Sequence, residues 1–297
     1  MADIDALVSS PAAIAAAALF GAIWGSFLNV AIARVPQGKS VIRPGSHCFA
    51  CGRPVRGWDN IPILSYFVLR GRCRACGAAF SARYALVEAL TALLSAVLYW
   101  KFVGAATTAI GSGADVALAV RLARFGLYFA FTAALIVLSF IDFDTKTLPD
   151  VITLPAIVIL FFAAFAVHQV PWTERAIGAV AGYLFVFLVS EGYYRAFKRE
   201  GLGLGDGKLL AMVGAVFGWK ALPFVLFAGS FIGTVVSVPL LLWARRRRPA
   251  APSDDPEAHV AALRLVEIPF GPYLSLGAVV YLLFADAVWR LARDVLL

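Results

Sequence analysis

Charged residues are scarce in this chain: they make up 15% of its 297 residues, whereas hydrophobic residues make up 61%. Water-soluble domains carry about 25% charged residues, so this composition excludes an ordinary soluble protein. It predicts an all-α polytopic membrane protein. The net charge of +8 is typical of cytoplasmic loops rich in Lys and Arg. Basic and aromatic residues are not interleaved as in nucleic-acid-binding surfaces, so we expect no nucleic-acid partner.

Basic residues are absent before Arg34, and Asp3 and Asp5 precede the first apolar run. A cleavable signal peptide starts with basic residues and has an apolar core of roughly 7–15 residues. We therefore expect an uncleaved first span with its N-terminus outside. Since about 20 apolar residues cross a bilayer, the chain holds about eight candidate transmembrane helices. They cover roughly 12–32, 86–103, 123–141, 151–168, 176–194, 207–219, 221–243 and 271–290.

The distribution of Lys and Arg predicts the orientation of these helices. Basic residues gather in segments 33–85, 195–208 and 245–248, whereas the alternate connections carry few. Basic loops face the cytoplasm, so we expect these segments, and the loop 142–150, on the cytoplasmic side. The polar, Pro-rich stretch at about 245–265 is predicted to be a disordered cytoplasmic loop.

Cysteine is also scarce, and all four cysteines lie in the cytoplasmic insert, in Cys48-Phe-Ala-Cys51 and Cys73-Arg-Ala-Cys76. Two Cys-x-x-Cys turns at this spacing are typical of a tetrahedral zinc site with four thiolate ligands. Such a shell is closed, so the metal would be structural. Two disulfides are the alternative, but thiols stay reduced on a cytoplasmic face. The sequence therefore predicts a small cytoplasmic Cys₄ zinc-binding insert.

Phosphate-binding motifs are absent from the glycine-rich stretch Gly201-Leu-Gly-Leu-Gly-Asp-Gly-Lys208. A P-loop ending at Lys208 would need glycine at position 202 and Ser or Thr at position 209, and both positions hold leucine. What remains is a flexible glycine run that brings Asp206 to the mouth of a span. The alternative interpretation is that Asp206 only caps the N-terminus of the following helix.

Three aspartates interrupt the apolar sequence elsewhere: Asp142, Asp144 and Asp150. Asp142 directly follows the apolar run 125–141, so it is best placed to face an intramembrane cavity, whereas Asp150 most simply caps the next helix. A serine or cysteine nucleophile with a histidine partner is absent. Two carboxyls that share a partly dry cavity hold one proton between them, which suits acid–base hydrolysis by Asp142 and Asp206.

Longer strings carry a family resemblance. They are Gly25-Ser-Phe-Leu-Asn-Val-Ala-Ile-Ala-Arg-Val-Pro36, Asp59-Asn-Ile-Pro-Ile-Leu-Ser-Tyr66, Ser81-Ala-Arg-Tyr-Ala-Leu-Val-Glu88 and Ile268-Pro-Phe-Gly-Pro272, together with both cysteine turns and both aspartate segments. In these the chain resembles the bacterial type IV prepilin peptidases, which are membrane aspartic proteases of the Gly-x-Gly-Asp kind. The resemblance covers nearly the whole chain.

The resemblance implies an enzyme of the bacterial cytoplasmic (inner) membrane. Such enzymes cut the leader of prepilins or pseudopilins after glycine on the cytoplasmic face. They then methylate the new N-terminus with S-adenosylmethionine. By position, Asp142 and Asp206 are implied as the catalytic pair, Cys48, Cys51, Cys73 and Cys76 as zinc ligands, and Gly203, Gly205 and Lys208 as support around Asp206. No methyl-donor motif is visible in the sequence.

The same resemblance divides the chain into a first span (1–33), a cytoplasmic zinc-binding domain (34–85) and a transmembrane aspartic protease domain (86–297). Two other functions stay open. Another Gly-x-Gly-Asp intramembrane protease, cutting general signal peptides or membrane helices, would keep the aspartates but need no zinc insert. A non-enzymatic, zinc-stabilised transporter or scaffold would use the aspartates as a proton or ion site.

Overall fold

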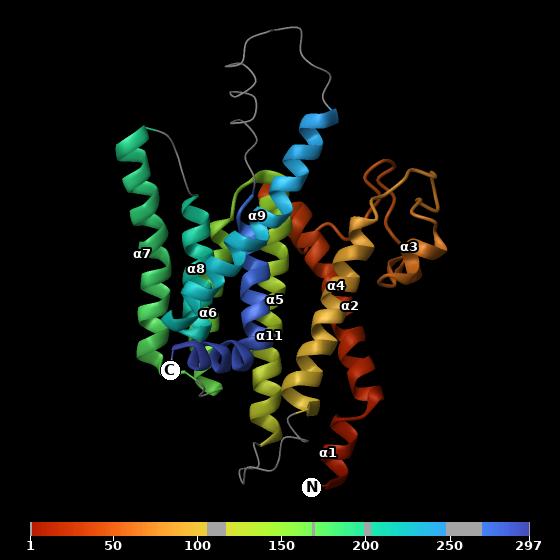
Figure 1. The fold of residues 1–297 in the computed structure, drawn as a ribbon. Coiled ribbons are helices and arrows are strands. Elements are labelled where there is room, and N and C mark those ends of the chain that lie inside the picture. The colour runs from red at the N-terminus through yellow and green to blue at the C-terminus, as the bar shows by residue number, and fades with distance from the viewer. Residues whose placement is uncertain (1, 106–116, 168–169, 199–202, 248–268, 297) are drawn as a thin grey trace. The chain divides into compact units, whose positions relative to one another are not determined.

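The computed structural model describes residues 2–105, 117–167, 170–198, 203–247 and 269–296 (Figure 1). Over these residues the fold is all helical, and the only β-type pairs are two isolated bridges in the insert. The chain forms two compact units. The first comprises residues 1–141 and 149–172, and the second comprises residues 142–148 and 173–297. The disordered loop predicted at about 245–265 lies almost entirely outside the described residues.

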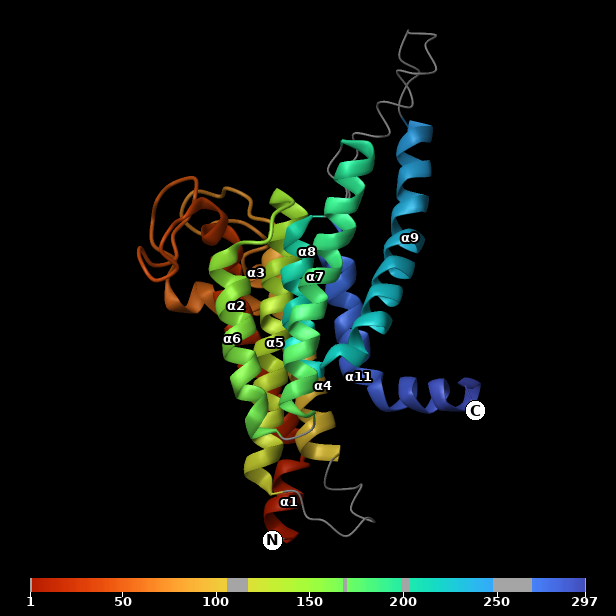
Figure 2. The same ribbon diagram turned by 90° about the vertical axis from the view of Figure 1, so that its left-hand side faces the viewer.

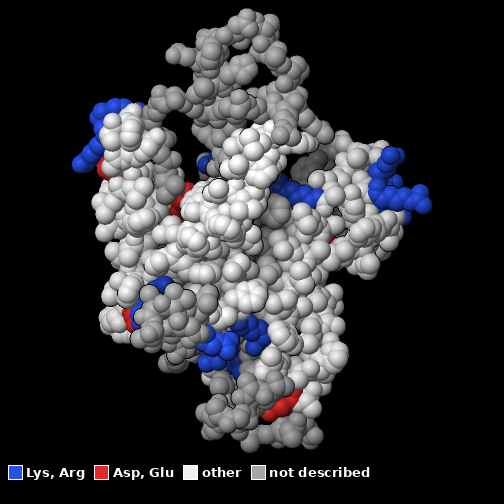
Figure 3. Space-filling view, in the orientation of Figure 1, with Lys and Arg blue, Asp and Glu red and all other residues white. Residues whose placement is uncertain are grey.

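Every predicted span coincides with a helix. Within the residues that the structure describes, five helices are long and apolar enough to cross a membrane: Pro11–Gln37, Arg83–Gly104, Leu118–Thr145, Trp172–Phe197 and Trp219–Trp243. Two shorter apolar helices, Asp150–Ala166 and Gly271–Ala285, lie where the fourth and eighth spans were expected. The sixth expected span is helix α8, Leu204–Phe217. Figure 3 shows broad helical surfaces with almost no charged side chains, as lipid contact requires. The multi-pass membrane architecture is confirmed.

In the first unit, two helices pack with unusually close backbones. Helix α2 (Pro11–Arg34) runs beside α4 (Arg83–Tyr99), as Figure 1 shows. A methyl group at Gly21 would lie 2.5 Å from Ser95 Cβ, and one at Gly25 would lie 2.7 Å from Glu88 Cα. Small residues four positions apart therefore let these helices approach, as in membrane helix pairs. The other elements of this unit are α1 (Ala2–Val8), η1 (Val35–Gln37), η2 (Gly57–Asn60), α3 (Leu64–Val68), η3 (Trp100–Gly104), α5 (Leu118–Thr145, as far as Ile141), α6 (Asp150–Ala163) and η5 (Ala164–Ala166).

The insert is anchored to this helix pair by a buried carboxylate. The backbone N–H of Ile63 donates a hydrogen bond of 2.7 Å to Oε2 of Glu88, a residue of α4 that is only 9% exposed. Ile63 has a φ of +64°, which is a strained conformation for a β-branched residue. The hydrogen bond to Glu88 helps to hold that conformation and so fixes the loop before α3 against α4.

In the second unit, α8 is the most deeply buried helix, with ten of its residues buried. It packs against α7 (Trp172–Phe197) through glycine: a methyl group at Gly182 would lie 2.7 Å from the Leu210 carbonyl, and Gly178 meets the backbone of Gly214. Gly178 and Gly182 repeat the spacing of Gly21 and Gly25. Each unit therefore contains a pair of helices that pack closely because small residues lie at their contact. The short η6 (Trp219–Ala221) follows α8.

Helices α9 (Leu222–Arg247) and α11 (Gly271–Leu296) complete the second unit. Gly229 of α9 faces the backbone of Leu274, so the first turns of α11 lie close against α9. At Phe284 the backbone leaves the helical region (φ −124°, ψ 15°), and Figure 2 shows the C-terminal part of α11 turning sharply away. The straight first half of α11 brings its N-terminal residue, Gly271, to the site described below.

Candidate active site and metal centre

Asp142 lies in the last turns of α5 and is buried, with 5% of its surface exposed. The backbone N–H of Gly271, the first residue of α11, donates a hydrogen bond of 3.0 Å to its Oδ2. This contact joins residues 129 positions apart in sequence. A methyl group at position 271 would lie 2.7 Å from the same oxygen, so any larger residue there would force the Asp142 carboxyl to shift.

Asp206 lies in the first turn of α8 and is 7% exposed. The N-cap of α8 is Gly203, and no side chain makes a capping hydrogen bond there. Asp206 is therefore not a helix cap, and that alternative interpretation of the sequence is wrong. Its carboxyl group is close enough to that of Asp142 for the two to interact electrostatically. The structure thus brings together the two aspartates singled out from the sequence.

The three residues expected to support Asp206 differ in how closely they are packed. A methyl group at Gly205 would lie 3.0 Å from Leu148 Cβ, so glycine there lets the start of α8 approach the loop after Asp142. A methyl group at Gly203 would meet Asp206 Oδ2 only at 3.6 Å, an ordinary contact. Lys208 is half-buried in the same turn.

The other two aspartates of the first segment are exposed. Asp144 lies two residues after Asp142 on the surface. Asp150 is the first residue of α6, whose N-cap is Pro149 and makes no side-chain capping bond. The expectation that Asp150 caps this helix is therefore wrong, because Pro149 already fixes the chain direction at the cap position.

Sequence reasoning did not find Gly271 as a neighbour of Asp142. The signal was present in the string Ile268-Pro-Phe-Gly-Pro272, which is one of the strings that carry the resemblance. A proline at the second position of α11 is well placed, since the first N–H groups of a helix have no partner within it. The Gly271 N–H is one of those unpaired donors, and Asp142 accepts from it.

The metal centre is built from two matching turns in the insert. In the first, Cys48 N donates to Arg53 O and Gly52 N donates to Cys48 O, each at 2.9 Å. In the second, Cys73 N donates to Ala78 O at 2.8 Å and Gly77 N to Cys73 O at 2.9 Å. Gly52 and Gly77 have positive φ angles of 68° and 73°, which glycine adopts without strain.

The four cysteine Sγ atoms lie within 4.8 Å of one another and form no disulfide. Cys48 Sγ and Cys76 Sγ are 3.8 Å apart, which equals the ligand separation of about 3.8 Å in a tetrahedron with Zn–S bonds of about 2.3 Å. The donor set and its geometry therefore fit a metal ion, and zinc among metals.

The protonation of these thiols also fits a metal site. The amide groups of Cys51 and Ala50 lower the pKa of Cys48 to about 6. The Ala78 amide lowers the pKa of Cys76, but burial and the other thiols outweigh it and raise the pKa to about 11. Four thiolates therefore do not coexist at neutral pH without a cation between them. Nearby, Arg74 donates three hydrogen bonds to Asp59, two from Nε and one from Nη2. They hold the pKa of that carboxyl below its usual value and tie the central loop to the second turn.

Comparison with known proteins identifies the family. Residues 19–102 match the model of the bacterial peptidase A24 N-terminal domain, and residues 129–238 match the type IV leader peptidase family. The prepilin leader peptidase/N-methyltransferase of Aeromonas salmonicida is 36% identical over 92% of this chain and 91% of its own length. This chain belongs to the type IV leader peptidase family.

Two further members with the same name are similar over nearly their whole length. The protein of Neisseria gonorrhoeae is 34% identical over 96% of both chains, and that of Pseudomonas aeruginosa is 33% identical over 97% of this chain and 96% of its own. No solved structure is significantly similar to the chain. The leader peptidase segment 129–238 contains both aspartates, whereas Gly271 lies beyond it.

Proposed function

We propose that this chain is a prepilin leader peptidase/N-methyltransferase in which Asp142 and Asp206 are the catalytic pair. The observation that carries the proposal is the burial of these two carboxyls within electrostatic range of each other, at the ends of two apolar helices. Buried carboxyls are costly unless they are paired, and aspartic proteases use such a pair. The enzyme would cut the leader of type IV prepilins or pseudopilins after glycine and methylate the new N-terminus, as the names of its relatives suggest.

The contacts of the two carboxyls support different roles. Asp142 accepts the N–H of Gly271, and a backbone donor favours the ionised form of a carboxyl. No hydrogen bond to the Asp206 side chain is found among the described residues. In this mechanism Asp142 is the base that takes a proton from water, and Asp206 is the acid that gives its proton to the carbonyl oxygen of the scissile peptide. The water oxygen forms the C–O bond, which gives a tetrahedral intermediate. As the C–N bond breaks, Asp142 gives its proton to the leaving nitrogen and Asp206 takes a proton back from a hydroxyl group, which leaves a carboxylic acid and a free amine.

The cysteines and the basic segments complete the proposal. Cys48, Cys51, Cys73 and Cys76 would hold one structural zinc ion that stabilises the insert and takes no part in the reaction. Lys and Arg gather in segments 33–85, 195–208 and 245–248, which supports a site on the cytoplasmic side of the bacterial inner membrane. Figure 3 shows such side chains over the insert. S-adenosylmethionine would supply the methyl group.

Isosteric substitutions test the catalytic pair. We expect Asp142→Asn and Asp206→Asn each to reduce leader cleavage by at least about 100-fold, the usual contribution of one acid or base. The measurement is the intact mass of a prepilin co-expressed with each variant, which reports both the cut site and the added methyl. Asp144→Asn changes an exposed carboxyl in the same segment and serves as the control. Normal cleavage by either of the first two variants would contradict the assignment.

A further inference from the structure

The short helix α3 of the insert carries an exposed apolar face. Leu64, Phe67 and Val68 are 61%, 67% and 71% exposed. Phe67 and Val68 follow Leu64 by three and four positions, so the three side chains lie on one side of the helix. The opposite side packs within the insert, because the Tyr66 ring packs edge-on against Phe80 at 5.6 Å between centroids. Single exposed apolar residues are common, but a continuous apolar face marks a surface that binds something.

The backbone on either side of α3 fixes the direction of this face. Ile63 and Arg70 have φ angles of +64° and +53°, which are uncommon for any residue except glycine. Such conformations persist only where the surrounding contacts hold them. Ile63 N donates to Glu88 of α4, and Gly71 N, directly after Arg70, donates to Tyr66 O at 2.9 Å. The apolar face of α3 is therefore held in one orientation.

The contact with Glu88 places α3 beside a candidate membrane span. Glu88 lies five residues after Arg83, where the span Arg83–Gly104 begins. At 1.5 Å per residue this is about 8 Å along the helix. The headgroup region on each side of the hydrocarbon core is only roughly 5–7 Å thick. Figure 1 shows α3 at the side of α4 and not beyond its end. The apolar face of α3 therefore lies at the level of the lipids.

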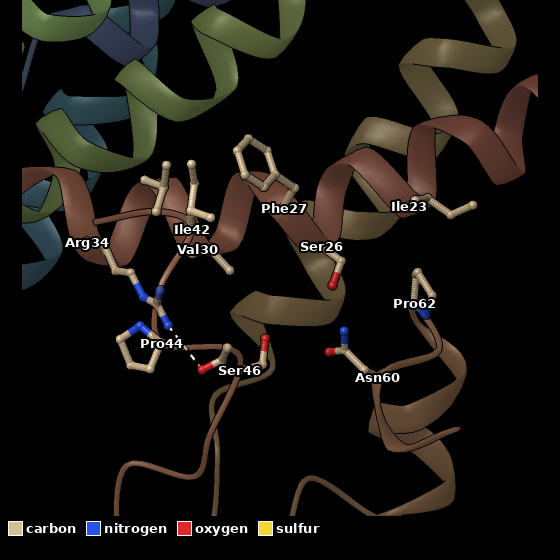
Figure 4. A pocket seen from close by; sticks show the side chains of 12 residues that line it. Ile23, Ser26, Phe27, Val30, Arg34, Ile42, Pro44, Ser46, Asn60 and Pro62 are labelled. Carbon is tan, nitrogen blue, oxygen red and sulfur yellow. Dashed lines mark hydrogen bonds between the residues drawn. The ribbon is translucent and has the colours of Figure 1, made fainter. Parts of the chain in front are cut away.

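A second contact, with α2, supports the same depth. Asn60 and Pro62, just before α3, line a cavity of about 390 Å³ together with Ile23 and Ser26 of α2 (Figure 4). Ser26 lies eight residues before the end of α2 at Arg34, or about 12 Å along the helix. Ile23 is 57% exposed and belongs to the apolar outer surface of this span. The loop that leads into α3 therefore continues a lipid-facing surface.

The charges of the insert also suit a membrane surface. Segment 34–85 contains nine Lys and Arg residues and one acidic residue, Asp59. The charge of Asp59 is already paired with Arg74. Arg56 lies over the ring of Trp58, 5.7 Å from its centroid, and Trp58 is 65% exposed. Arginine and tryptophan are typical of the boundary between acyl chains and anionic headgroups. The polar surroundings of α3 therefore match phospholipid.

We propose that the insert is embedded in the lipid leaflet on its own side of the membrane, with Leu64, Phe67 and Val68 among the outermost parts of the acyl chains. Arg56 and Trp58 lie at the headgroups of anionic phospholipids. The bilayer then holds the insert in addition to its cysteine turns, and α3 is interfacial rather than cytoplasmic. This anchoring is independent of the reaction proposed above.

Photocrosslinking distinguishes lipid from water at this face. Phe67 is replaced by the photoreactive p-benzoylphenylalanine in the full-length protein, in nanodiscs of phosphatidylethanolamine and phosphatidylglycerol. Phe49 is the matched control, since it is an exposed phenylalanine in the first cysteine turn of the same insert. After irradiation, mass spectrometry should show at least about tenfold more lipid adduct at position 67 than at position 49. Equal lipid adducts at both positions, or adducts of position 67 with a second protein chain, would overturn the proposal.

A charge on the same face gives an independent test. Phe67→Glu brings a carboxylate into the interfacial layer, where a charged residue costs more free energy the deeper it lies. We expect trypsin to cut the insert of this variant about tenfold faster than that of the wild type in nanodiscs, because the detached insert becomes more populated. Phe49→Glu makes the same chemical change in the first cysteine turn, and its digestion rate should stay within about twofold of the wild type.

The outcome of digestion separates lipid from water around α3. A digestion rate of Phe67→Glu equal to that of the wild type would show that α3 faces water and would overturn the proposal. Gel filtration and the unfolding temperature report whether each variant folds. If Phe67→Glu did not fold, photocrosslinking at position 67 would still decide, because that change keeps an aromatic side chain.

Discussion

The two units hold their polar centres in opposite ways. In the first unit, four cysteines gather at the surface of the insert, where they are exposed or half-buried, on turns at most 28 positions apart. In the second unit, two carboxyls are only 5% and 7% exposed and come from different helices. One of them is bound by an amide 129 positions away. The four thiols are close together in sequence and accessible to solvent, whereas the two carboxyls are far apart in sequence and buried.

This difference indicates what stabilises each centre. The thiol turns bury little apolar surface, so we expect a bound ion to supply the energy that holds them together. The carboxyls are held by packed helices, whose glycines at positions 205 and 271 leave room for close approach. We therefore expect the first centre to respond to loss of a ligand atom and the second to respond to small changes of shape.

Removal of two thiols should have the largest effect. Structural zinc contributes about 10–16 kcal/mol to the folding of small domains. In Cys51→Ser/Cys76→Ser we expect bound zinc to be lost and the insert to open to trypsin at its exposed arginines. Zinc analysis and limited trypsin digestion in detergent measure both effects. Ala50→Ser is the control, because it adds a hydroxyl in the same turn and keeps all four ligands. If the zinc-free insert resisted trypsin as well as the wild type does, the insert would not depend on a metal ion, and the contrast between the two centres would be wrong.

The same contrast explains how much the sequence could predict. The cluster of four cysteines follows from spacing, because a Cys-x-x-Cys turn with a following glycine encodes its own geometry. Asp142 and Asp206 were found because carboxyls at the ends of apolar runs are costly unless they have a use. The helices followed from apolar length, and each predicted span is helical.

Contacts between distant segments could not be predicted in the same way. The local sequence does not show that the amide of Gly271 contacts Asp142, or that Glu88 accepts a hydrogen bond from Ile63 and so fixes the loop before α3. Both contacts depend on which helix faces pack together, and periodicity gives only weak information where a helix is apolar all round. The same holds for the glycine pairs that join α2 to α4 and α7 to α8.

A methyl group at Gly271 tests whether the carboxyl centre responds to a small change of shape. In Gly271→Ala the new carbon would lie 2.7 Å from Asp142 Oδ2, so the carboxyl must shift and its N–H donor with it. Because a displacement of about 1 Å in a catalytic group can cost about 100-fold in rate, we expect a loss of this size in leader cleavage. Gly192→Ala is the matched control, since a methyl group there meets no atom within 4 Å. Equal rates for the two variants would show that the Gly271 contact does not position Asp142.

The smallest effect should come from the third buried acid, Glu88. Glu88→Gln keeps an acceptor for the Ile63 N–H but removes the charge, so the hydrogen bond weakens from an ionic to a neutral one. We expect about 1 kcal/mol less stability on thermal unfolding, and a loss of cleavage far below that of Asp206→Asn. The two substitutions are chemically alike and both are buried, so they differ only in what the carboxyl does. If Glu88→Gln abolished cleavage as completely as Asp206→Asn, Glu88 would not be a merely supporting carboxyl. The division of labour between the two units would then be wrong.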